Sequence, residues 1–261
     1  MSTRPETIPF SHLARAAYCP RQLYYARRDD DLSPPEDVAA VRDLAFAYDR
    51  LRGMRDERLA DRPIAVPPAE YRANLATVAE RDDYAALAEP AVRDAFLRGR
   101  DCHGIAHKVI GVDPEGAAEA GSGADGASDD VDAGDDGANS VADGDRNGVS
   151  PTPVVISPGA PPERGVWEPQ RVRAVAAAKA LAWERERDIP TALVEYPAHG
   201  VVRTVRLTTR NKSAYRRVLW TVRSMSGVPS RTHEKSKCEA CEYRGACGTK
   251  TRSLKTMLGL G

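Results

Sequence analysis

The stretch CHGIAHKVIGV, residues 102–112, carries small, apolar and β-branched side chains in near alternation, a pattern typical of a β-strand. It ends at the turn sequence Asp113-Pro114-Glu115-Gly116. The apolar run at residues 153–157 resumes the strand pattern. We therefore expect these two segments to pair as one β-hairpin with a long tip.

The segment between these strands is acidic and poor in large apolar side chains. Residues 113–150 carry eleven acidic residues and one arginine, and residues 117–150 consist mainly of Gly, Ala, Ser and Asp. Such a composition cannot bury enough apolar surface to offset the entropy lost on ordering. The sequence predicts a disordered acidic insert over residues 113–152.

Helical and strand patterns alternate on both sides of the hairpin. The apolar spacing predicts helices at 11–28 with a break at Pro20, 36–52, 68–98 with a break at Pro90, 168–187 and 209–225, and strands at 191–197 and 201–208. This order predicts an α/β or α+β fold. We divide the chain into a helical N-terminal region (1–100), a core (101–226) and a C-terminal cysteine segment (227–261).

Three cysteines lie close together near the C-terminus. Cys238 and Cys241 form a CxxC motif, and Cys247 follows. Their thiolates can converge on one centre, and Cys19, beside Pro20, is the natural fourth ligand. Four thiolates suit either a [4Fe–4S] cluster or tetrahedral zinc, and the spacing does not separate the two. Cys102, on the first predicted strand, is expected to be a small core residue.

Composition excludes a membrane-spanning protein. The chain has 261 residues, 41% of them hydrophobic and 29% charged, and no apolar run approaches the roughly 20 residues that a spanning helix needs. The N-terminal residues lack the apolar core of a secretory signal. We expect a cytoplasmic protein, where thiols stay reduced and five cysteines indicate metal binding more than disulfides.

The net charge of zero conceals a basic body. Residues 113–150 carry −10, so the rest of the chain carries +10. A basic surface favours binding to a phosphate backbone. The alternative is that arginine simply covers solvated faces. We expect Trp167, Trp183 and Trp220 to pack in the core more than to stack on bases.

The chain resembles the CRISPR-associated, iron–sulfur branch of the RecB-like exonucleases, in the PD-(D/E)xK nuclease superfamily. The resemblance lies in YCPRQLYY (18–25), GIA (104–106), GVP (227–229) and KCEACEY (237–243) followed by Cys247, and it covers most of the chain outside the acidic insert. It implies a restriction-endonuclease-type core. It also implies that Cys19, Cys238, Cys241 and Cys247 bind a [4Fe–4S] cluster.

The chain departs from this family at the nuclease centre. The resemblance aligns His107, Val155 and Ser157 with the family's catalytic Asp, Glu and Lys. The family's early histidine falls near Glu57, and its later glutamine has no clear counterpart in residues 173–179. A Mg²⁺ or Mn²⁺ centre needs carboxylates, which His107, Val155 and Ser157 do not supply.

Three acidic residues are possible substitutes for the lost carboxylates. Asp101 precedes the first strand and Asp113 opens the turn after it, whereas Glu195 lies on a predicted strand. Of the three, we expect only Glu195 to face the old nuclease centre.

These observations predict an iron–sulfur, DNA-binding protein of nuclease fold that has lost catalysis. Its expected ligand is single-stranded DNA or DNA ends, with a CRISPR integrase or nuclease as partner in DNA-end or spacer processing. One alternative is an active Mn²⁺- or Mg²⁺-dependent exonuclease on single-stranded DNA. The other is a zinc-stapled interaction module.

Overall fold

The structure is a computed structural model that describes residues 7–29, 37–112, 150–232 and 234–248. Most of the predicted disordered insert, together with Asp113, lies outside the described residues. The elements in chain order are β1 Ile8–Pro9, α1 Phe10–Tyr18, α2 Pro20–Arg28, α3 Asp37–Leu44, α4 Tyr48–Arg52, α5 Asp56–Ala60, α6 Pro68–Ala79, α7 Tyr84–Ala88, β2 Val92–Arg98, β3 Cys102–Ile110, β4 Thr152–Ile156, α8 Glu168–Glu184, β5 Thr191–Tyr196, β6 Val201–Arg206, α9 Thr209–Arg223 and α10 Lys235–Glu239.

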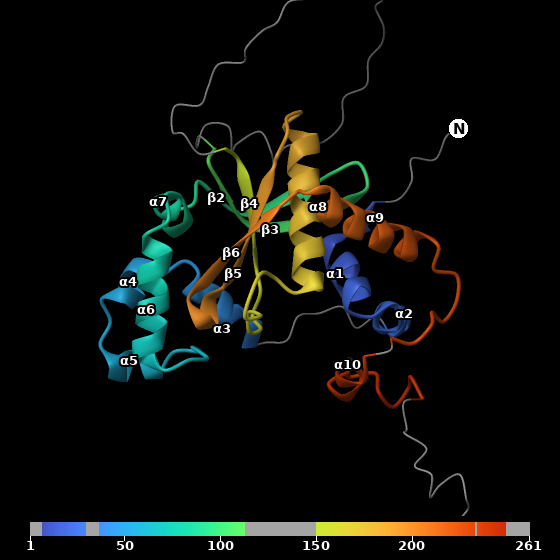
Figure 1. Cartoon of the computed structure of the whole chain (residues 1–261), viewed down its shortest axis with the longest axis horizontal. Coiled ribbons are helices and arrows are strands. Elements are labelled where there is room, and N and C mark those ends of the chain that lie inside the picture. The colour runs from blue at the N-terminus through green and yellow to red at the C-terminus, as the bar shows by residue number, and fades with distance from the viewer. Residues whose placement is uncertain (1–6, 30–36, 113–149, 233, 249–261) are drawn as a thin grey trace, which may run out of the picture.

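A six-stranded mixed sheet forms the centre of the molecule (Figure 1). The strands follow the order β1-β3-β4-β5-β6, and β2 pairs with β3. β3 and β4 are antiparallel with Lys108 opposite Val154, which confirms the predicted hairpin. β4 and β5 are parallel because α8 crosses over between them, and β5 and β6 form a second antiparallel pair.

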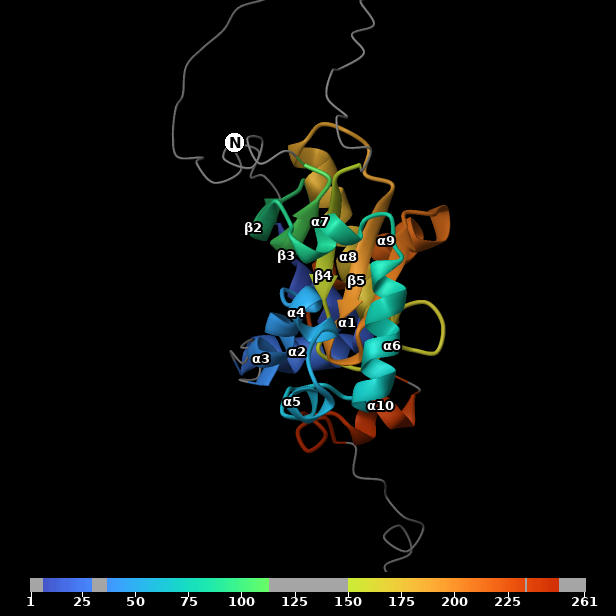
Figure 2. The same cartoon turned by 90° about the vertical axis from the view of Figure 1, so that its left-hand side faces the viewer.

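Helices cover both faces of this sheet. α1, α8 and α9 pack on one face, and α3 to α7 pack on the other, as Figures 1 and 2 show from two directions. α10 lies beside α2 at one end of the molecule (Figure 1). The prediction of a mixed α/β architecture is confirmed.

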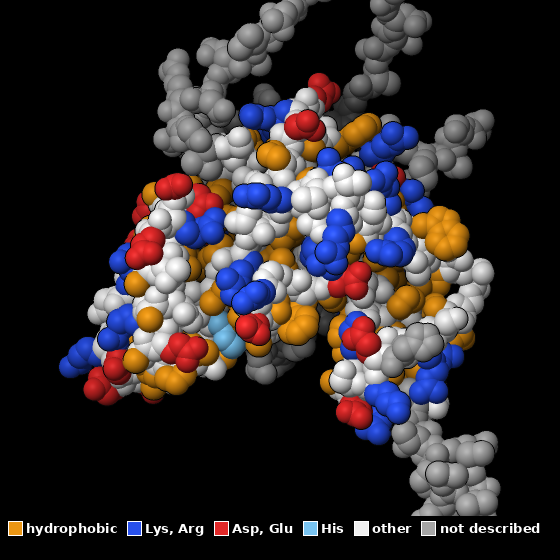
Figure 3. Space-filling model, in the orientation of Figure 1, with side chains coloured by type: hydrophobic (Ala, Val, Ile, Leu, Met, Phe, Trp, Pro, Cys, Tyr) orange, Lys and Arg blue, Asp and Glu red, His pale blue; other side chains and the backbone are white. Residues whose placement is uncertain are grey.

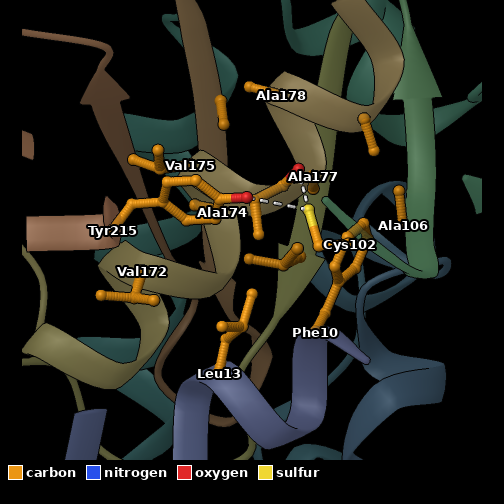
Figure 4. Packing of buried hydrophobic residues seen from close by; sticks show 14 of the residues in the cluster. Phe10, Leu13, Cys102, Ala106, Val172, Ala174, Val175, Ala177, Ala178 and Tyr215 are labelled. Carbon is orange, nitrogen blue, oxygen red and sulfur yellow. Dashed lines mark hydrogen bonds between the residues drawn. The ribbon is translucent and has the colours of Figure 1, made fainter. Parts of the chain in front are cut away.

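The central helix α8 is apolar around most of its circumference. It lies between the sheet on one side and α1 and α9 on the other, so it has little solvent-facing surface. Its alanines allow this close approach, and Figure 4 shows several of them packed around Cys102 and Tyr215. The buried alanines are Ala174, Ala176, Ala177, Ala178 and Ala180.

A glycine on β3 lets α1 approach the sheet. A Cβ atom at Gly104, whose φ is +152°, would lie 2.6 Å from Cδ2 of Phe10. That separation is shorter than real Cβ contacts, so a side chain here would displace the buried Phe10 ring.

Two predicted helices differ from the structure. The helix expected over residues 36–52 is divided into α3 and α4, and the helical prediction for residues 92–98 is wrong. Residues 92–98 were expected to continue a helix, but they form the edge strand β2 on β3. The apolar residues Val92, Ala95 and Phe96 have helical spacing, whereas pairing with the free edge of β3 satisfies the backbone. Tertiary pairing therefore overrides the local pattern.

None of the helices in the described ranges is both long and apolar enough to cross a membrane.

Candidate functional site

The structure brings Cys19 together with the three C-terminal cysteines. Cys19 occupies the extended residue between α1 and α2, where Pro20 begins the second helix. Cys238 lies in α10, and Cys241 and Cys247 lie in the turns that follow. All four side chains line one pocket of about 340 Å³, a volume that includes the solvent at its mouth.

Side chains of α1 and α2 hold the cysteine segment in place. Tyr25 stacks on Tyr243 with ring centroids 5.9 Å apart, and its hydroxyl donates to the carbonyl oxygen of Ala246 at 3.2 Å. The Tyr18 hydroxyl donates to the carbonyl oxygen of Lys237 at 3.3 Å. These contacts explain how a segment with one short helix keeps a defined position.

The surroundings of Cys241 and Cys247 act on the thiols of this pocket. Burial raises the pKa of the Cys241 thiol, and the negative charges of Cys19 and Cys247 act in the same direction. Arg21 donates a hydrogen bond from Nη1 to the sulfur of Cys247 at 3.5 Å. A bound metal would favour the thiolate form of these ligands, because metal binding requires deprotonated cysteines.

The sulfur positions also bear on the kind of metal. Across the described part of the chain, no three His, Cys, Asp or Glu side chains come close enough to hold one metal ion. A zinc ion with Zn–S bonds of about 2.3 Å requires its sulfurs to stand roughly 3.8 Å apart. The four thiols line one pocket, but among the described residues they do not form the arrangement of a mononuclear metal site.

Cys102 lies apart from this pocket, in the core between β3 and α8 (Figure 4). Tyr215 donates a hydrogen bond to its sulfur at 3.3 Å, and the sulfur contacts the carbonyl oxygen of Ala176 at 3.7 Å. Burial raises the pKa of Cys102 to about 11. The prediction that Cys102 is a small core residue is confirmed.

The three positions aligned with nuclease residues lie near one another and are buried. His107 accepts a hydrogen bond at Nδ1 from the backbone N–H of Ile156 at 3.0 Å. Val155 packs in the core beneath α8. Ser157 accepts a hydrogen bond from Nε2 of Gln170, at the start of α8, at 3.2 Å. Each side chain is thus occupied by protein contacts.

Positive charge surrounds His107. Burial lowers its pKa to about 3, and the nearby cations of Arg173 and Arg42 add to this effect. Burial also lowers the pKa of Arg173 to about 10, and its Nε has no hydrogen-bond partner among the described residues. Arg42 forms an ion pair with Asp94. A divalent cation would be repelled from this place.

Glu195 does not face these positions, which corrects the expectation from the sequence. Its carboxylate accepts a hydrogen bond from Nζ of Lys108 at 2.9 Å, and both side chains have no exposed surface. The same Nζ donates to the carbonyl oxygens of Ala45 and Leu87 at 2.7 and 2.8 Å. Glu195 therefore points toward α3–α7, away from α8, and is committed to an ion pair.

The other acidic residues singled out in the sequence lie elsewhere. Asp101 forms an ion pair with Arg223 of α9 at 2.8 Å. Glu57 is exposed on the short helix α5, on the side of the sheet away from α8. Neither residue meets His107 or Ser157 through any hydrogen bond or ion pair of the described residues.

Sequence reasoning missed three residues around these sites. Gln170 lies three positions before residues 173–179, where the family's glutamine was expected. The sequence feature that could have identified it is its place in the first turn of α8. Lys108 and Arg173 gave no signal, because a lysine in a strand and an arginine in a helix are usually solvated.

No protein-family model matches the chain, and no curated protein matches it significantly. The function must therefore be inferred from the residues and their arrangement.

The buried His107 predicts a specific loss of stability in acid. Its folded pKa of about 3 lies below the ordinary 6.5, so its contribution is present above pH 6.5 and is lost as the pH falls toward 3. Between pH 7 and pH 4 the wild type should lose about 3 kcal/mol more unfolding free energy than His107→Gln. Urea denaturation at both pH values measures this difference.

The glutamine carbonyl can still accept from the N–H of Ile156 but does not titrate. His12, whose pKa is also lowered to about 4, is present in both proteins and cancels in the comparison. An equal loss of stability in the two proteins would contradict the assignment to His107.

Proposed function

We propose that this protein is a cytoplasmic iron–sulfur protein of the RecB-like nuclease fold that binds single-stranded DNA and does not cut it. The observation that carries the proposal is the convergence of Cys19 with Cys238, Cys241 and Cys247 around one pocket. The segments around Cys19 and Cys238, more than 200 residues apart in the sequence, meet at this pocket. This arrangement accords with the iron–sulfur family that the motifs resemble.

The resemblance of the cysteine motifs to the iron–sulfur family supports a [4Fe–4S] cluster over zinc. In such a cluster each thiolate binds a different iron, so the four sulfurs surround a group of atoms and not a point. Cys19, Cys238, Cys241 and Cys247 would hold the cluster, with Arg21 donating a hydrogen bond toward the Cys247 sulfur. The cluster would supply a strong covalent link between α2 and the C-terminal segment.

The surroundings of His107 support a loss of nuclease activity. Phosphodiester cleavage by this superfamily needs a divalent cation held by carboxylates at the scissile phosphate. Val155 and Ser157 carry no charge, Arg173 and Arg42 repel cations, and Glu195 is bound to Lys108 on the other face. We propose that the protein acts through a partner nuclease or integrase in DNA-end or CRISPR spacer processing.

The distribution of charge supports DNA as the ligand. Outside residues 113–150 the chain carries +10. Residues 196–233, which include β6 and α9, contain eight arginine and lysine residues and no aspartate or glutamate. Such a surface attracts a phosphate backbone and releases counterions on binding.

The decisive experiment is a nuclease and binding assay on anaerobically purified protein. We expect iron–sulfur absorbance, salt-dependent binding to labelled single-stranded DNA, and no cleavage with Mg²⁺ or Mn²⁺. The triple variant His107→Asp, Val155→Glu, Ser157→Lys is the matched comparison, and any metal-dependent cleavage that it gains would identify the lost centre.

Three results would overturn parts of the proposal. Metal-dependent cleavage by the unaltered protein, abolished by His107→Ala, would establish an active exonuclease. Stoichiometric zinc without iron would favour the zinc-stapled module. Absence of DNA binding would remove the nucleic-acid function altogether.

A further inference from the structure

The exposed face of α9 carries an unusual combination of side chains. Trp220 is 70% exposed, the highest value among the exposed large hydrophobic residues of the described chain. Arg216 and Arg217 lie four and three positions before it and Arg223 lies three positions after it, so all three are its neighbours on the helix surface. We call these four residues the α9 stripe.

Trp220 takes no part in the core, so the expectation that it packs is wrong. The opposite side of α9 supplies the packing against α8 and α1. Its buried residues are Ala214, Tyr215, Val218, Leu219 and Val222. Trp167 and Trp183 are also more than half exposed. Folding stability therefore does not explain why an indole ring occupies position 220.

Basic side chains flank Trp220 along α9, and the last of them, Arg223, pairs with Asp101. Residues 196–233 contain no acidic residue, and basic side chains gather over the region of α9 in Figure 3. Arg216 bonds only to the backbone oxygen of Lys212, and Arg217 has no ion-pair partner in the described ranges. Arg223 is held by Asp101. Two arginine guanidinium groups beside the indole are thus available for an anion.

We propose that the α9 stripe binds single-stranded DNA, with Trp220 stacking on one base and Arg216 and Arg217 contacting phosphates beside it. The proposal rests on the DNA-binding function proposed above and specifies where the strand lies. Unpaired bases expose their faces to an aromatic ring, whereas bases in a duplex are already stacked on one another. The surface therefore fits a single strand better than a duplex.

The same face is poorly suited to an apolar protein partner. Protein interfaces bury a contiguous, largely apolar centre. Along the α9 stripe the neighbours of Trp220 are arginines, and the adjoining exposed residues Ser213 and Ser224 are polar. A lone indole among cations matches the stacking and phosphate contacts of single-strand binders.

The test compares Trp220→Ala with Trp183→Ala on full-length protein. Trp183 is 58% exposed but lines a hollow with Asp101, Glu186 and Asp188, so it is a matched control on a mixed-charge surface. For a labelled 20-nucleotide oligothymidine, Trp220→Ala should weaken binding about tenfold, and Trp183→Ala should leave it unchanged. Trp220→Phe should recover most of the affinity.

The arginines and the duplex provide independent readouts. Arg216→Ala and Arg217→Ala should each flatten the slope of log K against log salt by about 0.7, whereas Trp220→Ala should leave this slope unchanged. A duplex of equal length should bind with no dependence on Trp220. If Trp220→Ala binds the oligonucleotide as well as the wild type does, the α9 stripe is not the binding site, although the protein still binds DNA. Failure of the wild type to bind the oligonucleotide would overturn the proposed function as well.

Discussion

Replacing Cys19 with serine is expected to bleach the protein and to release the C-terminal segment from α2. The proposed cluster cross-links residues more than 200 positions apart, and chain entropy alone assigns such a cross-link of the order of 5 kcal/mol. The free energy of metal binding adds to this loss, because a site formed only in the folded state stabilises folding. Iron and sulfide content, visible absorbance and thermal unfolding measure the effect.

Cys102→Ser is the control for this experiment. Cys102 is buried in the core, where its sulfur accepts a hydrogen bond from Tyr215, and it lies outside the cysteine pocket. The variant should keep its colour and iron content, with a modest loss of stability from the altered core contact. Bleaching by Cys102→Ser together with full colour in Cys19→Ser would show that the fourth ligand is Cys102.

Replacing Lys108 with methionine is expected to destabilise the fold by about 3–5 kcal/mol. The ammonium group binds Glu195 and the carbonyl oxygens of Ala45 and Leu87, all within 2.9 Å. Methionine has a similar length but no donor, so it leaves the buried carboxylate of Glu195 without its cation and the two carbonyl oxygens without this donor. Urea denaturation at neutral pH measures the loss.

The double variant Lys108→Met, Glu195→Met separates the ion pair from the packing. Removing both charges eliminates the unpaired carboxylate, so the double variant should be more stable than Lys108→Met alone. Arg206→Met removes an exposed cation from β6 and should change stability by less than about 0.5 kcal/mol. If the double variant loses as much unfolding free energy as Lys108→Met and Glu195→Met together, the two side chains are not energetically coupled.

The unfolding free energy of Lys108→Met should depend on pH, because Glu195 remains buried in that variant. Burial raises the pKa of Glu195, and Lys108 opposes that rise. Without Lys108 the folded pKa rises further, so the unpaired charge destabilises the fold above that pKa and is neutralised below it. The deficit of Lys108→Met should therefore shrink as the pH falls.

Most elements of the core were predictable because their signals are local. The strands β3 and β4, the helix α8 and the pair β5–β6 have apolar patterns that can each be recognised within a short stretch of sequence. The strand β2 was not predictable, because its residues have helical spacing and only the free edge of β3 makes them a strand.

The cysteine pocket was partly predictable. Cys238, Cys241 and Cys247 share one short segment, so their closeness is a property of the sequence. The approach of Cys19 depends on the stacking of Tyr25 on Tyr243 and on the hydrogen bond from Tyr18 to Lys237, which join distant segments. The sequence suggested this approach because Cys19 lies beside Pro20 and because YCPRQLYY resembles the motif of a family whose matching cysteine binds the cluster.

The sequence by itself determined most helices and strands of the core, though not β2, together with the basic body and the set of cysteines, since these follow from composition and short-range spacing. Only the tertiary structure decided that Glu195 binds Lys108 on the face away from His107, and that Trp220 is exposed beside arginines. A strand that is buried on both faces lacks the alternation of apolar and polar residues from which the face of each side chain could be predicted. The face of a side chain then depends on register and packing between distant segments, which no local pattern encodes.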